Sequence, residues 1–309
     1  MKSLLVFSPE VVAARAKGQA IVALESTIIT HGMPFPQNVQ TAALVEAEVR
    51  SHGAVPATIA VMAGRIHIGL SAAELDSLGR ATGAMKLSRA DLAVCLALGH
   101  TGATTVAATM ICAQLAGIAV FATGGIGGVH RGAEYSFDIS ADLSELAATA
   151  VTVVAAGAKA ILDLPKTLEV LETLGVPVIA FGQDDFPAFW SRSSGLRAPL
   201  RMDTAAQIAA AHLMRGRLGL PGGQLVANPI PATAEIDRAT IMPVIEAALT
   251  DAQAQGIGAK AVTPFLLQRI YELTQGRSLD ANIALVLNNA RLASAIAGEI
   301  ITAQRRTPL

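Results

Sequence analysis

The stretch IAVFATGGIGGVHRGAEYSFDISADL, residues 118–143, joins an apolar run, a glycine-rich loop and a dense set of polar side chains. The apolar run 118–122 predicts a buried strand. Four glycines within residues 124–128 leave the following backbone free to approach a ligand closely. Ligands of parallel α/β sheets bind at the carboxyl ends of strands, so this loop marks a candidate active site.

Strand and helix patterns alternate on both sides of this stretch. After the prolines of VANPIP, residues 236–296 are helical in pattern with breaks near Gly256 and Gly276. We therefore expect one α/β domain over residues 1–309, a three-layer α/β/α fold with a mostly parallel central sheet and a helical C-terminal portion. Strands are predicted at 20–24, 58–62, 65–68 (a hairpin with the preceding run), 119–123, 151–155, 176–181 and 225–228. Helices are predicted at 10–17, 38–52 with Asn38 as cap, from Ser71, after Ser88, and at 102–117, the last with its N-terminus facing the site.

Composition excludes several classes of partner. The 309 residues carry a formal net charge of −1 with scattered basic residues, which argues against binding of nucleic acid or of an anionic membrane surface. Charges and glycines interrupt each apolar run before about 20 residues, so we expect no membrane span, and we expect no export signal in residues 1–20. Cys95 and Cys112 lie in apolar surroundings and are expected to be reduced, buried thiols of a cytoplasmic protein.

A lysine closes the apolar run VTVVAAGAK at residues 151–159. Partial desolvation of the Lys159 ammonium favours the neutral amine, which is the nucleophilic form. The alternative is a surface lysine at a strand-to-helix turn. Lys166 follows Pro165 at the start of a predicted helix and is expected to be solvated.

The other polar residues also have structural alternatives. Glu25 ends the predicted strand 20–24 and is either an acid/base group or a buried structural carboxylate. Asp138 and Asp142 could cap a helix that begins near Leu143, and Arg131 could pair with Glu134. His31 and His130 lie beside glycines, where hydrogen bonding is favoured over metal ligation, and Asn288 and Asn289 are expected to pack within a helix.

Several longer motifs carry a family resemblance. They are ALESTIITHGMP from Ala23, KLSRADL from Lys86, GATTVAATM from Gly102, GGIGGVHRGAEYSFDISADL from Gly124, AGAKAILDLPKTLEVLETLGVPV from Ala156, VANPIP from Val226, TPFLL from Thr263 and NIALVLNNA from Asn282. With these motifs the chain resembles the pseudouridine-5′-phosphate glycosidases, or pseudouridylate synthases, a family that includes the indigoidine-cluster protein A. One departure is LGHTG at residues 98–102, where His100 has no role that we can assign.

The resemblance implies an enzyme of the carbon–oxygen lyase class. It would reversibly cleave the carbon–carbon glycosidic bond of pseudouridine 5′-phosphate to give uracil and ribose 5-phosphate. By resemblance, Lys159 is the nucleophile that forms an imine with the sugar, and Glu25 is the acid/base that protonates the ribose ring oxygen. A covalent amine route suits this bond because carbon is a poor leaving group.

The resemblance also implies a metal, substrate contacts and an assembly. Asp138 would bind one Mn²⁺ (or Mg²⁺) per subunit, and such hard cations accept few protein ligands when waters and a substrate phosphate complete the shell. The family forms homotrimers. Lys86, Val106, Ser140 and Asp142 match substrate-binding positions, and His130, Arg131 and Asn282 are expected in the pocket. Two alternatives stay open at this stage: a Schiff-base aldolase or lyase acting on another sugar phosphate, and a non-catalytic phosphosugar-binding protein.

Overall fold

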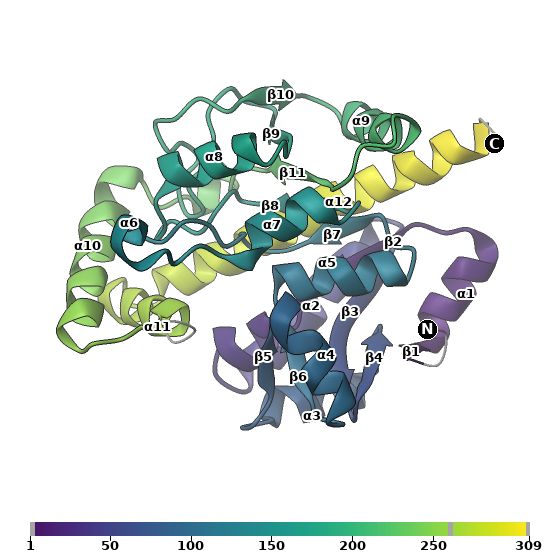
Figure 1. Ribbon diagram of the computed structural model, residues 1–309, viewed down its shortest axis with the longest axis horizontal. Helices are drawn as coiled ribbons and strands as arrows, with labels where there is room; N and C mark the ends of the chain where they lie inside the picture. The colour runs from purple at the N-terminus through teal and green to yellow at the C-terminus, as the bar shows by residue number, and fades with distance from the viewer. Residues whose placement is uncertain (1–3, 259–261, 307–309) are drawn as a thin grey trace.

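A mostly parallel sheet runs through the centre of the protein, as the alternating strands and helices predict (Figure 1). The computed structural model describes residues 4–258 and 262–306. Seven neighbouring strands of the sheet are all parallel, and most of their residues are buried because helices cover both faces. In spatial order they are β3 (Val55–Met62), β2 (Ile21–Leu24), β7 (Val120–Ala122), β8 (Thr152–Ala155), β11 (Gln224–Ala227), β9 (Val178–Phe181) and β10 (Leu200–Met202).

Beyond β3 the sheet changes direction. The predicted hairpin is present, since β4 (Arg65–Ile68) pairs antiparallel with β3. β6 (Gly102–Thr104) also pairs antiparallel with β3, β5 (Met85–Leu87) runs parallel to β6, and β1 (Leu5–Phe7) runs parallel to β4. The strands β1, β5, β6 and β10 have three residues each, too few for a periodic pattern, and the sequence did not predict them.

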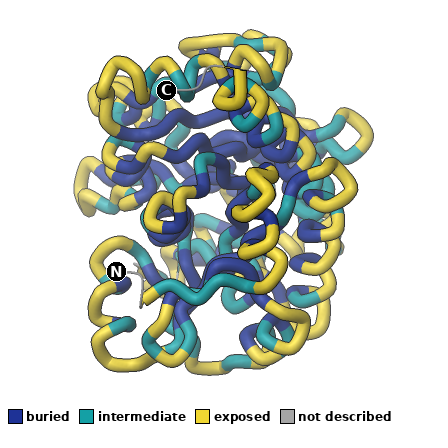
Figure 2. The backbone as a smooth tube through the Cα atoms, turned by 90° about the vertical axis from the view of Figure 1, so that its right-hand side faces the viewer, coloured by how far each residue is buried: buried dark blue, intermediate teal, exposed yellow. Residues whose placement is uncertain are grey.

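Two helical layers enclose the parallel strands. One layer holds α2 (Gln37–Ser51), α9 (Ala205–Arg217) and α12 (Arg277–Arg306), and α12 packs along β2, β7 and β8. The other layer holds α5 (Val106–Leu115), α7 (Ala141–Ala148) and α8 (Leu164–Thr173) (Figure 1). In the side view the central strands form a dark blue, buried interior beneath largely exposed outer turns (Figure 2). The predicted three-layer α/β/α fold is therefore confirmed.

The remaining helices frame this core. The helical C-terminal portion is present and breaks where the glycines predict. These elements are α1 (Pro9–Lys17), the π-helical turn η1 (Ile28–Gly32), α3 (Ala72–Arg80), α4 (Arg89–Ala97), α6 (Ala133–Ser136), the 3₁₀ turn η2 (Ala232–Ala234), α10 (Arg238–Ala254) and α11 (Val262–Leu273).

Two local predictions were wrong. Residues 102–117 are not one helix: β6 comes first, and α5 begins after Thr105, whose hydroxyl accepts from the amide of Ala108. Asn38 does not cap α2, because it lies inside the helix and its amide nitrogen donates to the carbonyls of Ile29 and Gly79 at 2.6 and 2.9 Å. A buried asparagine thus joins η1 and α3 to α2 rather than ending a helix.

Among the described residues one helix, α12, is long and apolar enough to span a membrane by length and composition. Its most apolar window is 56% buried against the rest of the fold, which is typical of a core helix. Cys95 and Cys112 are both buried and unpaired, as predicted.

Candidate active site

A cavity of about 370 Å³ lies at the carboxyl ends of β2, β7 and β8. Glu25 follows β2, the glycine loop follows β7, and Lys159 follows β8, so three neighbouring parallel strands bring their carboxyl ends to one place. This is where ligands of open α/β sheets bind. Nine of the predicted site residues line the cavity: Glu25, Lys86, Val106, His130, Asp138, Ser140, Asp142, Lys159 and Asn282.

Arg131 is the one predicted residue that the structure does not bring into this cavity. It lines a neighbouring cavity of about 440 Å³ and forms an ion pair with Glu246 of α10. The alternative pairing with Glu134 is also wrong, since Glu134 pairs with Lys166 at 2.8 Å. Glu134 and Lys166 are 32 positions apart in the sequence, so the short spacing between Arg131 and Glu134 did not reveal this ion pair.

Gly125 and Gly127 of the glycine loop have no room for a Cβ atom, because neighbouring side chains pack directly on their backbone. A Cβ on Gly125 would lie 2.7 Å from the Phe189 ring. A Cβ on Gly127 would lie 2.2 Å from Ser140 Oγ and 2.8 Å from Asp142 Oδ2. The loop backbone therefore packs directly on groups that line the cavity, as the glycine run predicts.

Asp142 joins the glycine loop to the start of α5. Its buried carboxylate accepts from the amide of Gly127 at 2.8 Å and from the amide of Ala107 at 3.0 Å. The predicted capping role belongs to Ser140 instead, whose hydroxyl accepts from the amide of Asp142 and caps α7. Asp142 thus fixes the backbone of two segments that form the cavity wall.

Lys159 is half-buried at the end of the segment that follows β8. Its amide donates to the carbonyl of Ile126 at 3.1 Å, and Ala158 pairs with Ile126, so the lysine is placed against the glycine loop. Lys166 lies on α8 instead, is 47% exposed, and forms ion pairs with Glu134 and Asp163. The prediction of Lys166 as a solvated surface residue is confirmed.

Two threonine hydroxyls hold Glu25. Thr27 donates to Oε2 and Thr123 donates to Oε1, so both carboxylate oxygens accept from a fixed donor. Thr27 comes from the loop after β2 and Thr123 from the end of β7. The sequence did not single out either threonine, because their partner is defined only when β2 and β7 pair.

The histidines of the cavity favour the neutral form. Burial lowers the pKa of His130, and the charges of Lys159 and Lys86 lower it further, against the opposing effect of the Asp138 carboxylate. Burial and the Lys86 charge also lower the pKa of His31. Neutral imidazoles can both donate and accept hydrogen bonds, which fits the predicted hydrogen-bonding role.

Asn289 is a residue whose role sequence reasoning missed. It was expected to pack within a helix, yet its amide reaches from α12 to the carbonyl of Thr123 at 2.7 Å and accepts from Asn228 at 3.0 Å. Asn282, which lines the cavity, lies seven positions earlier and therefore on the same side of the helix. The spacing of Asn282 and Asn289 on one helix was the sequence signal that could have indicated this role.

Asp138 is the one carboxylate that the family resemblance assigns to the metal. It is half-buried on the cavity wall, and across residues 4–258 and 262–306 there is no group of three or more His, Cys, Asp or Glu side chains that could hold an ion. Such a donor set fits a hard cation that completes its shell with waters and phosphate oxygens, and does not fit a metal held by protein ligands alone.

The fold and this cavity define an α/β protein with a lysine, a glutamate and a glycine loop around one strand-end pocket. The family described as "Indigoidine synthase A like protein" matches residues 10–299. The chain belongs to this family.

Curated relatives and solved structures agree with this family membership. The chain is 74% identical to a pseudouridine-5′-phosphate glycosidase of Paracoccus denitrificans over 98% of this chain and 100% of that protein. It is 72% identical to the same-named protein of Jannaschia sp. over 96% and 99%. The crystal structure of the prealnumycin C-glycosynthase AlnA in complex with ribulose 5-phosphate superposes with a TM-score of 0.91 at 38% identity, covering 98% and 99%. An indigoidine synthase A-like protein from Thermotoga maritima superposes with a TM-score of 0.87 at 34% identity, covering 96% and 97%.

Proposed function

We propose that this protein reversibly cleaves the carbon–carbon glycosidic bond of pseudouridine 5′-phosphate to uracil and ribose 5-phosphate. The observation that carries the proposal is that Lys159 and Glu25 line one cavity together with the glycine loop. Relatives that share 74% and 72% of the residues are named for this activity. The structurally similar C-glycosynthase was solved with ribulose 5-phosphate, a ligand similar in size and charge to ribose 5-phosphate.

The two residues have complementary tasks in this chemistry. Glu25 protonates the ring oxygen of the ribose, so the bond from that oxygen to the anomeric carbon breaks and the sugar opens. The Lys159 amine bonds to the anomeric carbon. The nitrogen lone pair then forms the carbon–nitrogen double bond of an imine as the bond to uracil breaks, and the uracil carbon takes a proton. Water hydrolyses the imine, which releases ribose 5-phosphate and restores the amine.

The surrounding groups would orient the substrate. Lys86 supplies a cationic group and Ser140 a hydroxyl for the phosphate. Val106 and Phe189 supply apolar wall, and Asn282 supplies an amide that can both donate and accept. The Asp142 carboxylate fixes the glycine loop and the start of α5, which carries Val106.

Asp138 would hold a Mn²⁺ or Mg²⁺ ion together with waters and the substrate phosphate. When bound, the ion would neutralise phosphate charge and position the sugar. Removing divalent ions with a chelator is expected to raise KM and to be reversed by added Mn²⁺ in the wild type but not in Asp138→Ala.

We further propose a homotrimer that acts in the cytoplasm. Tyr135 and Phe137 are 89% and 83% exposed beside the cavity rim, and exposed aromatic patches commonly mark contacts between chains. The unpaired Cys95 and Cys112 fit a reducing compartment. Light scattering on the purified protein should give three times the mass of one chain. A monomer mass would contradict the assembly.

The decisive experiment combines product analysis with trapping. The protein is incubated with pseudouridine 5′-phosphate and Mn²⁺, borohydride is added, uracil is assayed, and adducts are mapped by mass spectrometry. We expect uracil release and a sugar-phosphate adduct on Lys159. Lys159→Ala should lose both while Lys166→Ala, the matched surface lysine, keeps both.

The other outcomes select the alternatives. An adduct from ribose 5-phosphate without uracil release would indicate a Schiff-base aldolase or lyase on another sugar phosphate. Binding of ribose 5-phosphate with neither uracil nor adduct would indicate a non-catalytic phosphosugar-binding protein.

A further inference from the structure

A third, small cavity of about 20 Å³ lies behind Glu25, on the side of α2. Four oxygen-bearing side chains line it: Glu25, Thr41, Thr58 and Thr123. The rest of its wall is apolar, from β2, α2, β7 and α12. A polar cavity needs roughly 10–15 Å³ to hold one water molecule, so this space fits one.

Thr41 adds a hydroxyl group to the lining of this cavity. The residue is 2% exposed. Buried hydroxyl groups in native proteins nearly always have a partner, either protein or water. A water in this cavity would lie against the side chains of Thr41, Glu25 and Thr58, which all line it.

Thr58 links the cavity to a buried carboxylate. Thr58 lies on β3 directly opposite Leu24, the residue before Glu25. Its hydroxyl donates to Glu46 Oε1 at 2.7 Å, and the two residues are 2% and 6% exposed. Glu46 is a buried titratable group that the proposed chemistry does not use.

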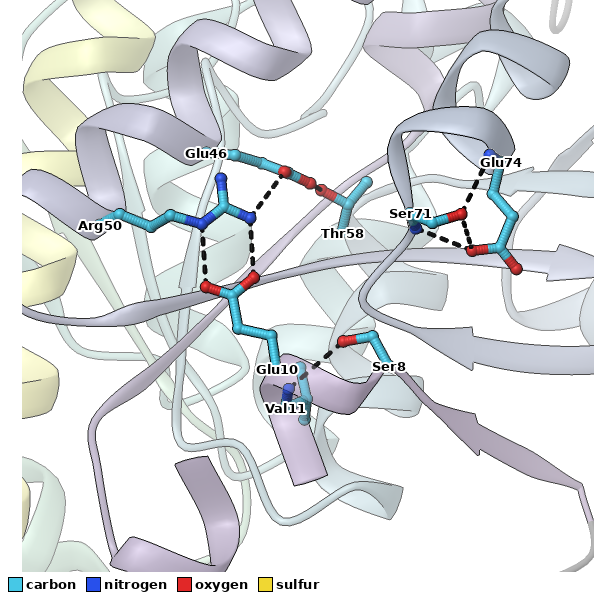
Figure 3. Close-up of polar contacts among 8 residues, drawn as sticks. All are labelled: Ser8, Glu10, Val11, Glu46, Arg50, Thr58, Ser71 and Glu74. Atoms are coloured by element: carbon cyan, nitrogen blue, oxygen red, sulfur yellow. Dashed lines mark hydrogen bonds and ion pairs between the residues drawn. The ribbon is translucent and has the colours of Figure 1, made fainter. Parts of the chain in front are cut away.

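A chain of ion pairs connects Glu46 to exposed residues at the protein surface (Figure 3). Its Oε2 lies 3.2 Å from Arg50 Nη2, and Arg50 forms two hydrogen bonds with Glu10 at 2.9 and 2.8 Å. Arg50 and Glu10 are each 43% exposed. All three residues line an outer cavity of about 600 Å³. Glu46 therefore lies between the inner cavity and a solvent-accessible one.

The environment of Glu46 suits a group that exchanges protons. Burial raises its pKa, and the nearby Glu10 carboxylate adds to this effect, against the Thr58 hydrogen bond and the Arg50 charge. A raised pKa makes proton uptake by this carboxyl easier than by an exposed glutamate.

We propose that the small cavity binds one water molecule and that this water, Thr58 and Glu46 form a proton path between Glu25 and the outer cavity. In the outward direction the Glu25 proton passes to the water, the water passes a proton to Thr58 Oγ1, and the Thr58 hydroxyl proton passes to Glu46 Oε1. Glu25 ends ionised, Glu46 ends protonated, and the water and threonine are unchanged. The reverse sequence reloads Glu25 for the next ring opening. This inference rests on the proposed role of Glu25 as acid/base.

The test compares variants that keep shape and remove proton transfer. Glu46→Gln retains a hydrogen-bond acceptor for Thr58 but cannot take up a proton, and Thr58→Val removes the hydroxyl at nearly constant volume. Thr58→Ser restores the hydroxyl. Glu48→Gln is the matched control, because Glu48 lies on the same helix and interacts instead with His52 and Arg291.

The readouts are kcat, KM and the solvent deuterium isotope effect on kcat for uracil release. We expect Glu46→Gln and Thr58→Val to lower kcat by about tenfold or more with KM unchanged, and to increase the isotope effect, since proton return to Glu25 becomes slow. Thr58→Ser and Glu48→Gln should match the wild type. Loss of packing alone would not increase the isotope effect.

Different results would contradict the proposed function and the proton path. An inactive wild type overturns the proposed function and the proton path together. An active wild type with unchanged kcat and isotope effect in Glu46→Gln and Thr58→Val overturns the path alone. A kcat loss without a larger isotope effect, or one that Thr58→Ser does not reverse, also overturns it.

Discussion

Asn289 is expected to contribute more to stability than other amides of its helix. It is fully buried, donates to the carbonyl of Thr123 at 2.7 Å and accepts from Asn228 at 3.0 Å. Asn289→Ala removes both bonds and leaves the Thr123 carbonyl and the Asn228 amide buried without this partner. One neutral hydrogen bond is worth about 1 kcal/mol and an orphaned buried group costs about 1–3 kcal/mol. The expected loss is about 3 kcal/mol in the free energy of unfolding.

The neighbouring Asn288 is the matched control. It is half-buried and makes one bond, from its amide to the carbonyl of Pro229 at 3.1 Å. Asn288→Ala should therefore cost about 1 kcal/mol. Urea unfolding measures both variants through the fluorescence of Trp190, the only tryptophan, which is buried. A loss in Asn289→Ala within about 0.5 kcal/mol of the loss in Asn288→Ala would refute the reasoning.

Three further predictions concern the loop, the ion pair of a buried carboxylate and a histidine. Gly125→Ala places a Cβ 2.7 Å from the Phe189 ring, so we expect KM for the sugar phosphate to rise at least about tenfold, measured by steady-state kinetics. Arg89→Ala leaves the fully buried Glu145 carboxylate without its cation, and because Arg89 is itself 58% exposed the expected cost in urea unfolding is about 1–3 kcal/mol. Burial and the Arg215 charge lower the pKa of His212, so its contribution is present above the unfolded pKa of about 6.5 and is lost as pH falls below it. His212→Gln should therefore reduce the stability difference between about pH 7.5 and pH 5.5, by up to about 1.4 kcal/mol per pH unit.

Matched variants separate these effects from general damage. Gly83→Ala meets no atom within 4 Å and should leave KM unchanged. Arg80→Ala removes an exposed pair with Asp76 and should leave the midpoint of urea unfolding nearly unchanged. A Gly125→Ala enzyme with normal KM, an Arg89→Ala protein as stable as Arg80→Ala, or an unchanged pH dependence in His212→Gln would each contradict its prediction.

Local pattern predicted the elements that carry the site. The apolar runs before Glu25, Gly124 and Lys159 are β2, β7 and β8, and the polar group after each run lines the cavity. This worked because buried parallel strands read as continuous apolar runs, and because the carboxyl ends of such strands share one edge of the sheet. Strands without such a run, for example β5, which carries Lys86, left no comparable pattern.

The partners of the site residues could not be predicted in this way. Asp142 meets Ala107, Glu25 meets Thr123, and Asn289 meets Thr123 across 35, 98 and 166 positions of the chain. For the same reason the sequence wrongly placed Arg131 in the cavity: its ion pair with Glu246, 115 positions away, lies outside it.

The sequence by itself determined the α/β class and which residues follow the strand ends, since those depend on local composition and periodicity. It also determined the family, through the resemblance of its long motifs. Only the tertiary structure decided which hydroxyls hold Glu25, that Asp142 fixes backbone rather than caps α7, and that Thr58 and Glu46 extend behind Glu25 to the surface. The physical reason is that hydrogen bonds between distant segments depend on how the helices pack on the sheet, and no local period encodes that packing.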